Sequence, residues 1–160
     1  MQKSNEGKRM NKGGQLVKDW MTSAPISIPW NVSALEAYRR MVEHGIRRLP
    51  VMDGDELVGI VTLGDVRAAD LSGIAGVDRS EIRSVISDLG VDRLMSRPVI
   101  TVTPEAPVRE AAKLMLEHKI AGLPVVSDER MIGIITESDI FRMVVETWEH
   151  EADPAADLQG

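Results

Sequence analysis

The sequence contains no cysteine, which excludes disulfide bonds, thiolate nucleophiles and thiolate metal ligands. Aromatic residues make up only 3% of the chain, so the hydrophobic core has to be built from aliphatic side chains and the nine methionines. No apolar run approaches the ~20 residues that span a bilayer, and the Lys-, Gly- and Asn-rich start lacks the apolar segment of a signal peptide. We therefore expect a cytoplasmic protein that does not bind membranes, a location compatible with the lack of cysteine.

Positive charge is also in deficit. The chain has 19 Lys and Arg against 25 Asp and Glu, a formal net charge of −6. This balance argues against nucleic-acid binding as the main task. The 43% hydrophobic content is ordinary for a globular protein, and 160 residues suit one compact domain or two small subdomains.

The dominant feature that is present is an internal repeat. When the chain is shifted by 74 positions, residues 17–68 align with residues 91–142 without a gap, and about 16 of the 52 aligned positions are identical. Most of the remaining pairs are conservative. Such long, gapless self-similarity predicts two copies of one structural unit.

Each unit is expected to contain the order strand, helix, strand, strand, helix. In the first copy we predict a short lead-in helix followed by a strand at 26–28, a helix at 33–44, strands at 49–52 and 57–61, and a helix at 65–71. Ser33 and Glu36 predict a reciprocal capping box at the start of the long helix, and Gly45 predicts its end. The strand at 57–61 is apolar nearly throughout and is expected to be buried on both faces. The apolar stripe of the long helix consists of Ala34, Ala37, Tyr38, Met41 and Val42.

The remaining segments follow from composition. We predict a flexible N-terminal tail at 1–16, the first unit at 17–71, a linker with a helix at 72–90, the second unit at 91–148, and a disordered acidic tail at 149–160.

One motif ends a strand in both units. Gly59–Asp65 and Gly133–Asp139 each read Gly-Ile-h-Thr-x-x-Asp, where h is apolar. Thr-x-x-Asp at a junction between strand and helix is a capping arrangement. An ionised carboxylate is also an acceptor for paired hydroxyl donors, and the two roles are compatible. The residues alone leave both open.

With the Leu-Pro-Val strands in His44–Val51 and His118–Val125, these motifs make the chain resemble a pair of CBS domains, the cystathionine-β-synthase-type repeats that form a Bateman module. The resemblance implies an α/β (α+β) fold of two pseudo-symmetric β-α-β-β-α repeats, with sheets packed face to face and helices outside. It also implies two clefts that bind adenosine-containing ligands, association into a homodimer, and regulation of a partner protein. We reject an inosine-monophosphate-dehydrogenase-like enzyme, because its barrel needs about 250 residues and its chemistry needs a cysteine nucleophile, and this chain has neither.

The resemblance also assigns residues to the clefts. One cleft would combine Asp65 and Thr62 with Ile100 and Ile120, and the other Asp139 and Thr136 with Ile26 and Ile46. The aspartates would bind ribose hydroxyls. Arg47 and Arg48 would bind phosphate beside Asp65, whereas the second unit has Ala121 and Gly122 at those positions. The two clefts are therefore expected to differ in charge, with Asp65 marking the better phosphate site.

The expected ligand is AMP, ADP or ATP, ranked above S-adenosylmethionine and NAD, and no cofactor is required. A ligand-free oligomerisation scaffold is the alternative function. His44 and His118 end equivalent helices, where a histidine interacts favourably with the negative C-terminal end of the helix dipole. No further cluster of metal-ligating residues accompanies them, so we predict no metal site. The regulated partner is not identified by the sequence.

Overall fold

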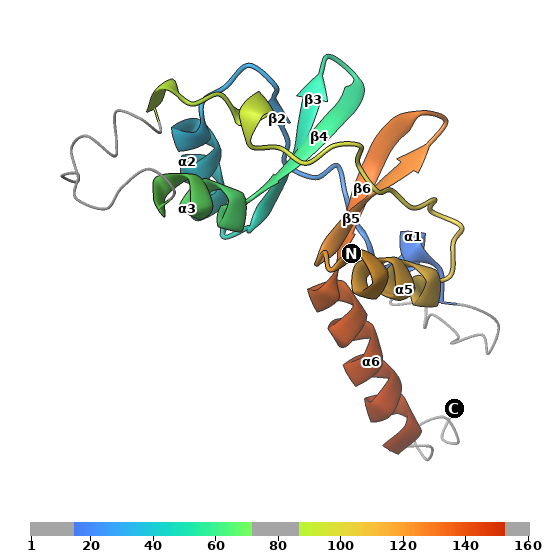
Figure 1. Ribbon diagram of the computed structural model, residues 1–160. Helices are drawn as coiled ribbons and strands as arrows, with labels where there is room; N and C mark the ends of the chain where they lie inside the picture. The colour runs from blue at the N-terminus through green and yellow to red at the C-terminus, as the bar shows by residue number, and fades with distance from the viewer. Residues whose placement is uncertain (1–14, 72–86, 153–160) are drawn as a thin grey trace, which may run out of the picture.

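The computed structural model describes residues 15–71 and 87–152, and the predicted α+β class with two small sheets is confirmed. The first part of the chain forms α1 (Val17–Trp20), β1 (Thr22–Ser23), β2 (Ile28–Pro29), α2 (Ala34–His44), β3 (Arg48–Asp53), β4 (Glu56–Thr62) and α3 (Leu63–Leu71). The second part forms the 3₁₀ helix η1 (Val91–Arg93), α5 (Val108–His118), β5 (Gly122–Ser127), β6 (Arg130–Thr136) and α6 (Glu137–Ala152). Figure 1 shows the two halves, with α2 and α3 beside one sheet and α1, α5 and α6 beside the other.

Each half contains a three-stranded sheet. The orders are β2-β3-β4 and β1-β6-β5. The β3–β4 and β5–β6 hairpins are antiparallel, and β4 and β6 lie in contact where the halves meet. Gly54 adopts a φ of 58° in the first hairpin turn, a conformation that glycine reaches without a steric cost.

The lead-in segments are exchanged between the halves. Val17 in α1 lies in the core of the second half, and β1 pairs with β6. The equivalent residues Val91 and Met95 lie in the core of the first half, and Ser96 bridges to Ile60 in β4. Each lead-in therefore packs on the unit that does not contain it in sequence, which ties the two repeats together.

The long helix of the first unit differs from its prediction in two details. Ser33 Oγ accepts from the Glu36 N–H at 3.2 Å, but the Glu36 carboxylate binds Arg40 Nε at 3.1 Å, so only half of the predicted capping box forms. The apolar stripe is narrower than predicted, because Tyr38 and Val42 are exposed to solvent. Gly45 ends the helix in the left-handed conformation, as predicted.

The burial predicted for the strand at 57–61 is wrong on one face. Gly59 and Val61 are buried in β4, whereas Leu57, Val58 and Ile60 are half-buried. Ile60 lines a cleft, which explains why this strand is apolar on both faces without being covered on both.

The C-terminal helix ends at a different residue from the one that the sequence predicted. α6 runs to Ala152, past the predicted start of the acidic tail. The predictions for residues 1–14, for most of the linker helix and for residues 153–160 lie outside the described residues. Among helices in the described ranges, none is both long enough and apolar enough to cross a membrane.

Candidate functional site

The Asp65 carboxylate closes the turn between β4 and α3. Its Oδ2 accepts hydrogen bonds from the Thr62 backbone N–H and from Thr62 Oγ1, both at 2.7 Å, and the Asp65 N–H donates to Thr62 Oγ1 at 3.2 Å. The capping role is therefore present. Asp65 Oδ1 has no hydrogen-bond partner within the described parts of the chain, so one carboxylate oxygen is left for another donor.

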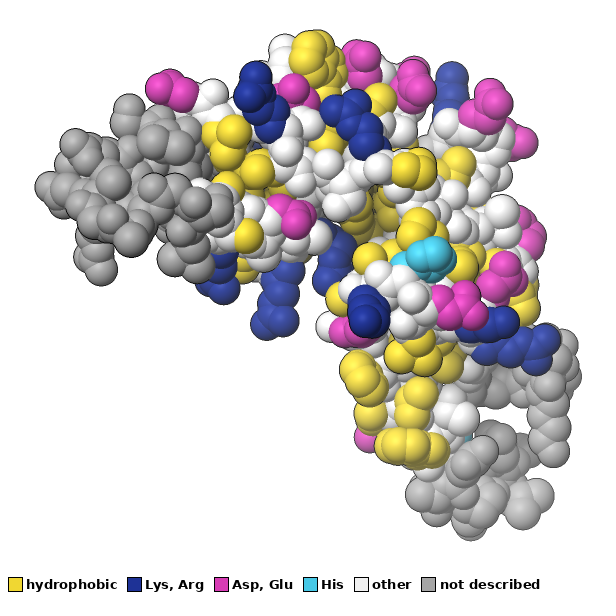
Figure 2. All heavy atoms as spheres, viewed as in Figure 1, with side chains coloured by type: hydrophobic (Ala, Val, Ile, Leu, Met, Phe, Trp, Pro, Cys, Tyr) yellow, Lys and Arg dark blue, Asp and Glu magenta, His cyan; other side chains and the backbone are white. Residues whose placement is uncertain are grey.

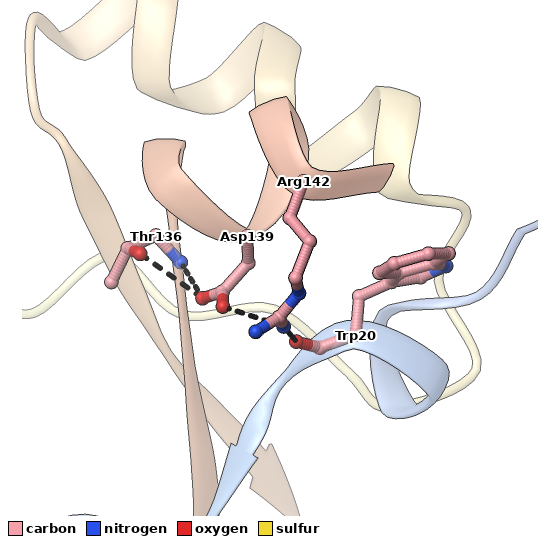
Figure 3. Close-up of polar contacts among 4 residues, drawn as sticks. All are labelled: Trp20, Thr136, Asp139 and Arg142. Atoms are coloured by element: carbon pink, nitrogen blue, oxygen red, sulfur yellow. Dashed lines mark hydrogen bonds and ion pairs between the residues drawn. The ribbon is translucent and has the colours of Figure 1, made fainter. Parts of the chain in front are cut away.

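Asp139 repeats the two hydrogen bonds to Oδ2 at the start of α6 and accepts a further one at Oδ1. Its Oδ2 accepts from the Thr136 N–H at 2.8 Å and from Thr136 Oγ1 at 3.0 Å. Its Oδ1 accepts from Arg142 Nη2 at 3.0 Å, as Figure 3 shows. Arg142 Nη2 also donates to the Trp20 carbonyl at 3.1 Å, so both carboxylate oxygens of Asp139 are engaged.

A cleft of ≈ 770 Å³ opens beside Asp65. Asp65 and Thr62 line it together with Ile100 and Ile120 from the second unit, the combination that the family resemblance implies. Four cationic side chains and one carboxylate are among its lining residues: Arg47, Arg48, Arg67, Lys119 and Asp65. This cleft can offer apolar surface to a flat ring and positive charge to an anion.

A second cleft, of ≈ 570 Å³, opens beside Asp139. Thr136 lines it with Ile26 and Ile46 from the first unit, and Ile26 is 36% exposed. Its charged lining residues are Arg47, Arg48, Glu137 and Asp139, two cations and two carboxylates. The charged lining residues of the two clefts are therefore unequal.

The reason for that inequality differs from the prediction. Arg47, Arg48 and Ala121 line both clefts, so the arginine pair does not belong to the Asp65 cleft alone. Arg48 lies against Gly122, its own repeat equivalent, where a Cβ atom would come within 2.8 Å of Arg48 Nη1. Only one member of this pair has room for a large side chain.

Arg48 is held in a mixed environment. Burial lowers the pKa of Arg48 below its usual value, the carboxylates of Glu137 and Asp139 oppose this effect, and Arg47 adds to it. Arg48 thus has carboxylates of the Asp139 cleft among its charged neighbours.

Four charged residues around the clefts were not predicted: Arg67, Lys119, Glu137 and Arg142. Their repeat equivalents are Phe141, Gly45, Leu63 and Ala68. Each pair differs in charge, and each stands within a few residues of the shared motifs. A comparison of repeat equivalents around those motifs would have found them.

Lys119 lines the Asp65 cleft and has a strained backbone conformation. It ends α5 with a φ of 55°, in the left-handed conformation that its equivalent Gly45 adopts with a φ of 63°. A residue with a Cβ costs about 1–2 kcal/mol in this conformation. The strain and the place of Lys119 on the wall of the Asp65 cleft make it a candidate for a ligand contact.

We expect Lys119→Gly to stabilise the protein by about 1 kcal/mol while weakening the binding of a phosphorylated ligand. Thermal denaturation and calorimetric titration with ATP measure the two effects. The matched control is Lys119→Ala, which removes the charge and keeps the strain, so it should weaken binding without stabilising the fold. An unchanged ATP affinity in both variants would contradict the assignment.

The histidines are not brought together with metal-ligating partners. His44 and His118 are exposed at the ends of α2 and α5. The described residues contain no group of three or more His, Asp or Glu side chains placed to hold a metal ion.

Comparisons with known proteins identify the family and related structures. A family model described as CBS domain matches residues 17–72 and 86–146. The solved structure of the CBS domain pair of protein MJ0100, in complex with 5′-methylthioadenosine and S-adenosyl-L-methionine, is 33% identical, with a TM-score of 0.71 over 84% of this chain and 98% of that one. The structure of CBSX2 in complex with AMP is 29% identical, with a TM-score of 0.71 over 83% of this chain and 98% of that one.

The L-aspartate semialdehyde sulfurtransferase of Methanocaldococcus jannaschii is 34% identical over 140 residues, which are 86% of this chain and 25% of that enzyme. This chain spans between 14% and 42% of the length of the first four curated relatives that it matches. The similarity therefore concerns one part of those larger proteins.

Proposed function

Because this chain belongs to the CBS domain family and contains two tandem repeats, we propose that it is a regulatory module that binds an adenosine-containing ligand beside Asp65 and controls a partner protein. Solved relatives carry such ligands: one is in complex with AMP, and another with 5′-methylthioadenosine and S-adenosyl-L-methionine. No catalytic step is part of this proposal.

The observation that carries the proposal is the state of the Asp65 carboxylate. Thr62 holds Oδ2 and fixes the orientation of the side chain, Oδ1 has no partner in the described residues, and Asp65 lines the cleft. The 2′- and 3′-hydroxyls of a ribose are adjacent hydrogen-bond donors, and such an oxygen can accept hydrogen bonds from them. Ile100 and Ile120 supply apolar surface on the same cleft for the adenine ring.

The charge of the cleft selects among adenosine compounds. Arg47, Arg67 and Lys119 accompany Arg48 there, and guanidinium groups pair with phosphate oxygens in a bidentate manner. AMP, ADP or ATP therefore fit this cleft better than ligands without phosphate. Affinity that rises from AMP to ATP would support this selection.

Isothermal titration calorimetry tests the proposal. The unmodified protein is titrated with AMP, ADP, ATP, NAD, S-adenosylmethionine and 5′-methylthioadenosine, each up to millimolar concentration. We expect heat from at least one adenine nucleotide. Absence of heat and of any thermal shift with all six compounds would reject the proposal and favour a ligand-free oligomerisation scaffold.

The proposal includes a homodimer, because an apolar surface is left uncovered on α5 and α6. Phe141, Val145 and Trp148 share one face of α6 and are 69%, 48% and 64% exposed, and Leu116 on α5 is 80% exposed. Figure 2 shows hydrophobic side chains gathered over this region. A second copy of the chain would cover such a surface by symmetric contact.

We expect Phe141→Glu to shift the protein from a dimer to a monomer of 17.6 kDa in sedimentation analysis, because it places a charge in the apolar contact. Glu149→Gln, an exposed change on the same helix, is the control and should leave the dimer intact. A monomeric unmodified protein would contradict the dimer without affecting the ligand proposal.

A further inference from the structure

Arg142 connects the Asp139 carboxylate to the lead-in helix. Nη2 donates to Asp139 Oδ1 at 3.0 Å and to the Trp20 carbonyl at 3.1 Å. The guanidinium carbon lies 5.9 Å from the centroid of the Trp20 ring. In Figure 3 the arginine reaches from α6 across the carboxylate to α1.

The two aspartates differ in the number of acceptor sites that remain. An ionised carboxylate offers about four lone-pair sites. Asp65 uses two of them, both on Oδ2, for Thr62. Asp139 uses two for Thr136 and a third for Arg142, so a vicinal diol would find one site where it needs two.

The ion pair with Arg142 and the burial of Asp139 also disfavour binding of a ribose at this carboxylate. Asp139 is only 7% exposed, and its nearest ion-pair partner is the guanidinium of Arg142. A carboxylate that is already paired is a weaker acceptor for a neutral hydroxyl than an unpaired one. The equivalent of Arg142 in the first unit is Ala68, which has no group that could pair with Asp65.

We propose that Arg142 is an internal competitor that keeps the Asp139 cleft from accepting the diol of a ribose. The protein then binds one adenosine-containing ligand per chain, in the Asp65 cleft, and removal of Arg142 creates a second site. This inference rests on the proposed function. Arg142 acts as a specificity-determining residue, and it does not have to contact the ligand.

Removal of Arg142 should leave the fold intact, because its side chain is 55% exposed and ion pairs of exposed side chains contribute little to stability. While Arg142 is paired with Asp139, the Asp139 cleft is expected to bind the same ligand about tenfold or more weakly than it would without Arg142, so the Asp65 cleft fills first.

The experiment measures stoichiometry and affinity with ATP and AMP as probes. The unmodified protein should bind one equivalent, and Arg142→Ala should bind two. In an Asp65→Asn background, which isolates the Asp139 cleft, adding Arg142→Ala should tighten binding about tenfold. Conversely, Ala68→Arg should introduce a guanidinium group that pairs with the Asp65 carboxylate, and this should weaken ligand binding in the Asp65 cleft.

The matched control is Arg40→Ala. It removes an exposed Arg–Glu pair on α2 that lies on neither cleft, so stoichiometry and affinity should not change. If Arg142→Ala unfolds, as judged by circular dichroism, Arg142→Gln removes the charge and keeps a polar side chain for the Trp20 carbonyl.

The outcomes separate the two proposals. Binding of one equivalent by both the unmodified protein and the Arg142 variant, with unchanged affinity in the Asp65→Asn background, would overturn the role of Arg142 alone. Weaker binding after Arg142→Ala would also overturn it, because Arg142 would then contact the ligand. Absence of binding by every variant and by the unmodified protein would overturn the proposed function and this inference with it.

Discussion

Asp65→Asn is expected to weaken nucleotide binding by about 30- to 150-fold, which corresponds to about 2–3 kcal/mol. Asparagine keeps one oxygen for the Thr62 N–H and hydroxyl, so the turn between β4 and α3 should survive. The change removes the negative charge and replaces the unpartnered Oδ1 by an amide donor. Hydrogen bonds to charged acceptors are the strong ones, so their loss dominates the effect. Calorimetric titration with ATP, accompanied by a thermal melt, measures binding and folding separately.

The repeat supplies the control for this prediction. Asp139→Asn is the same chemical change at the equivalent position, where Arg142 already occupies Oδ1. We expect it to change the affinity of the Asp65 cleft less than threefold, because the altered carboxylate lies in the other cleft. If Asp65→Asn bound ATP as tightly as the unmodified protein, Asp65 would be a helix cap without a ligand role.

Gly133→Ala is expected to lower the melting temperature by about 4–12 °C, a loss of about 2–3 kcal/mol. A Cβ at Gly133 would lie 2.6 Å from Met21 Sδ and 3.0 Å from the Thr22 carbonyl oxygen. Thr22 belongs to β1, which pairs with β6 through Ile134 and Gly133. The added methyl group therefore pushes against backbone, and the exchanged lead-in has to separate from the sheet.

Gly59→Ala at the equivalent position is the comparison. The nearest atoms to a Cβ there all belong to the side chain of Met95; its Sδ and Cγ can move away by rotation, whereas its Cβ, at 3.0 Å, stays in place. We expect a loss of about 1 kcal/mol, at the low end for an overpacked site. Gly64→Ala meets only Thr62 Oγ1 at 3.5 Å and should be neutral. Equal losses at Gly133 and Gly59 would show that the contact with the β1 backbone does not decide the cost.

Tryptophan fluorescence is a poor probe of the stability of these variants, because Trp20, Trp30 and Trp148 lie in different environments. Trp20 packs against the core of the second half, whereas Trp30 and Trp148 are 44% and 64% exposed. Circular dichroism, which reports on both halves together, is therefore the better probe of stability.

The sequence by itself determined the repeat, the order of its elements and the Thr-x-x-Asp motifs. These features are local: a helix stripe, a capping serine, Gly45 in the left-handed conformation and a strand before a helix depend on residues a few positions apart. The grouping of residues into two clefts followed from the family resemblance, and the structure places those residues together.

The tertiary structure decided what depends on distant residues. The exchange of lead-ins places Val17 in the second core and Val91 in the first, and it brings the Trp20 carbonyl to Arg142 across 122 positions. Arg47 and Arg48 line both clefts, and Gly122 leaves the room that Arg48 occupies. The two equivalent aspartates differ at Oδ1, which accepts from Arg142 in Asp139 and has no partner among the described residues in Asp65. The motif is the same in both repeats, but the cleft beside each copy combines residues of both units.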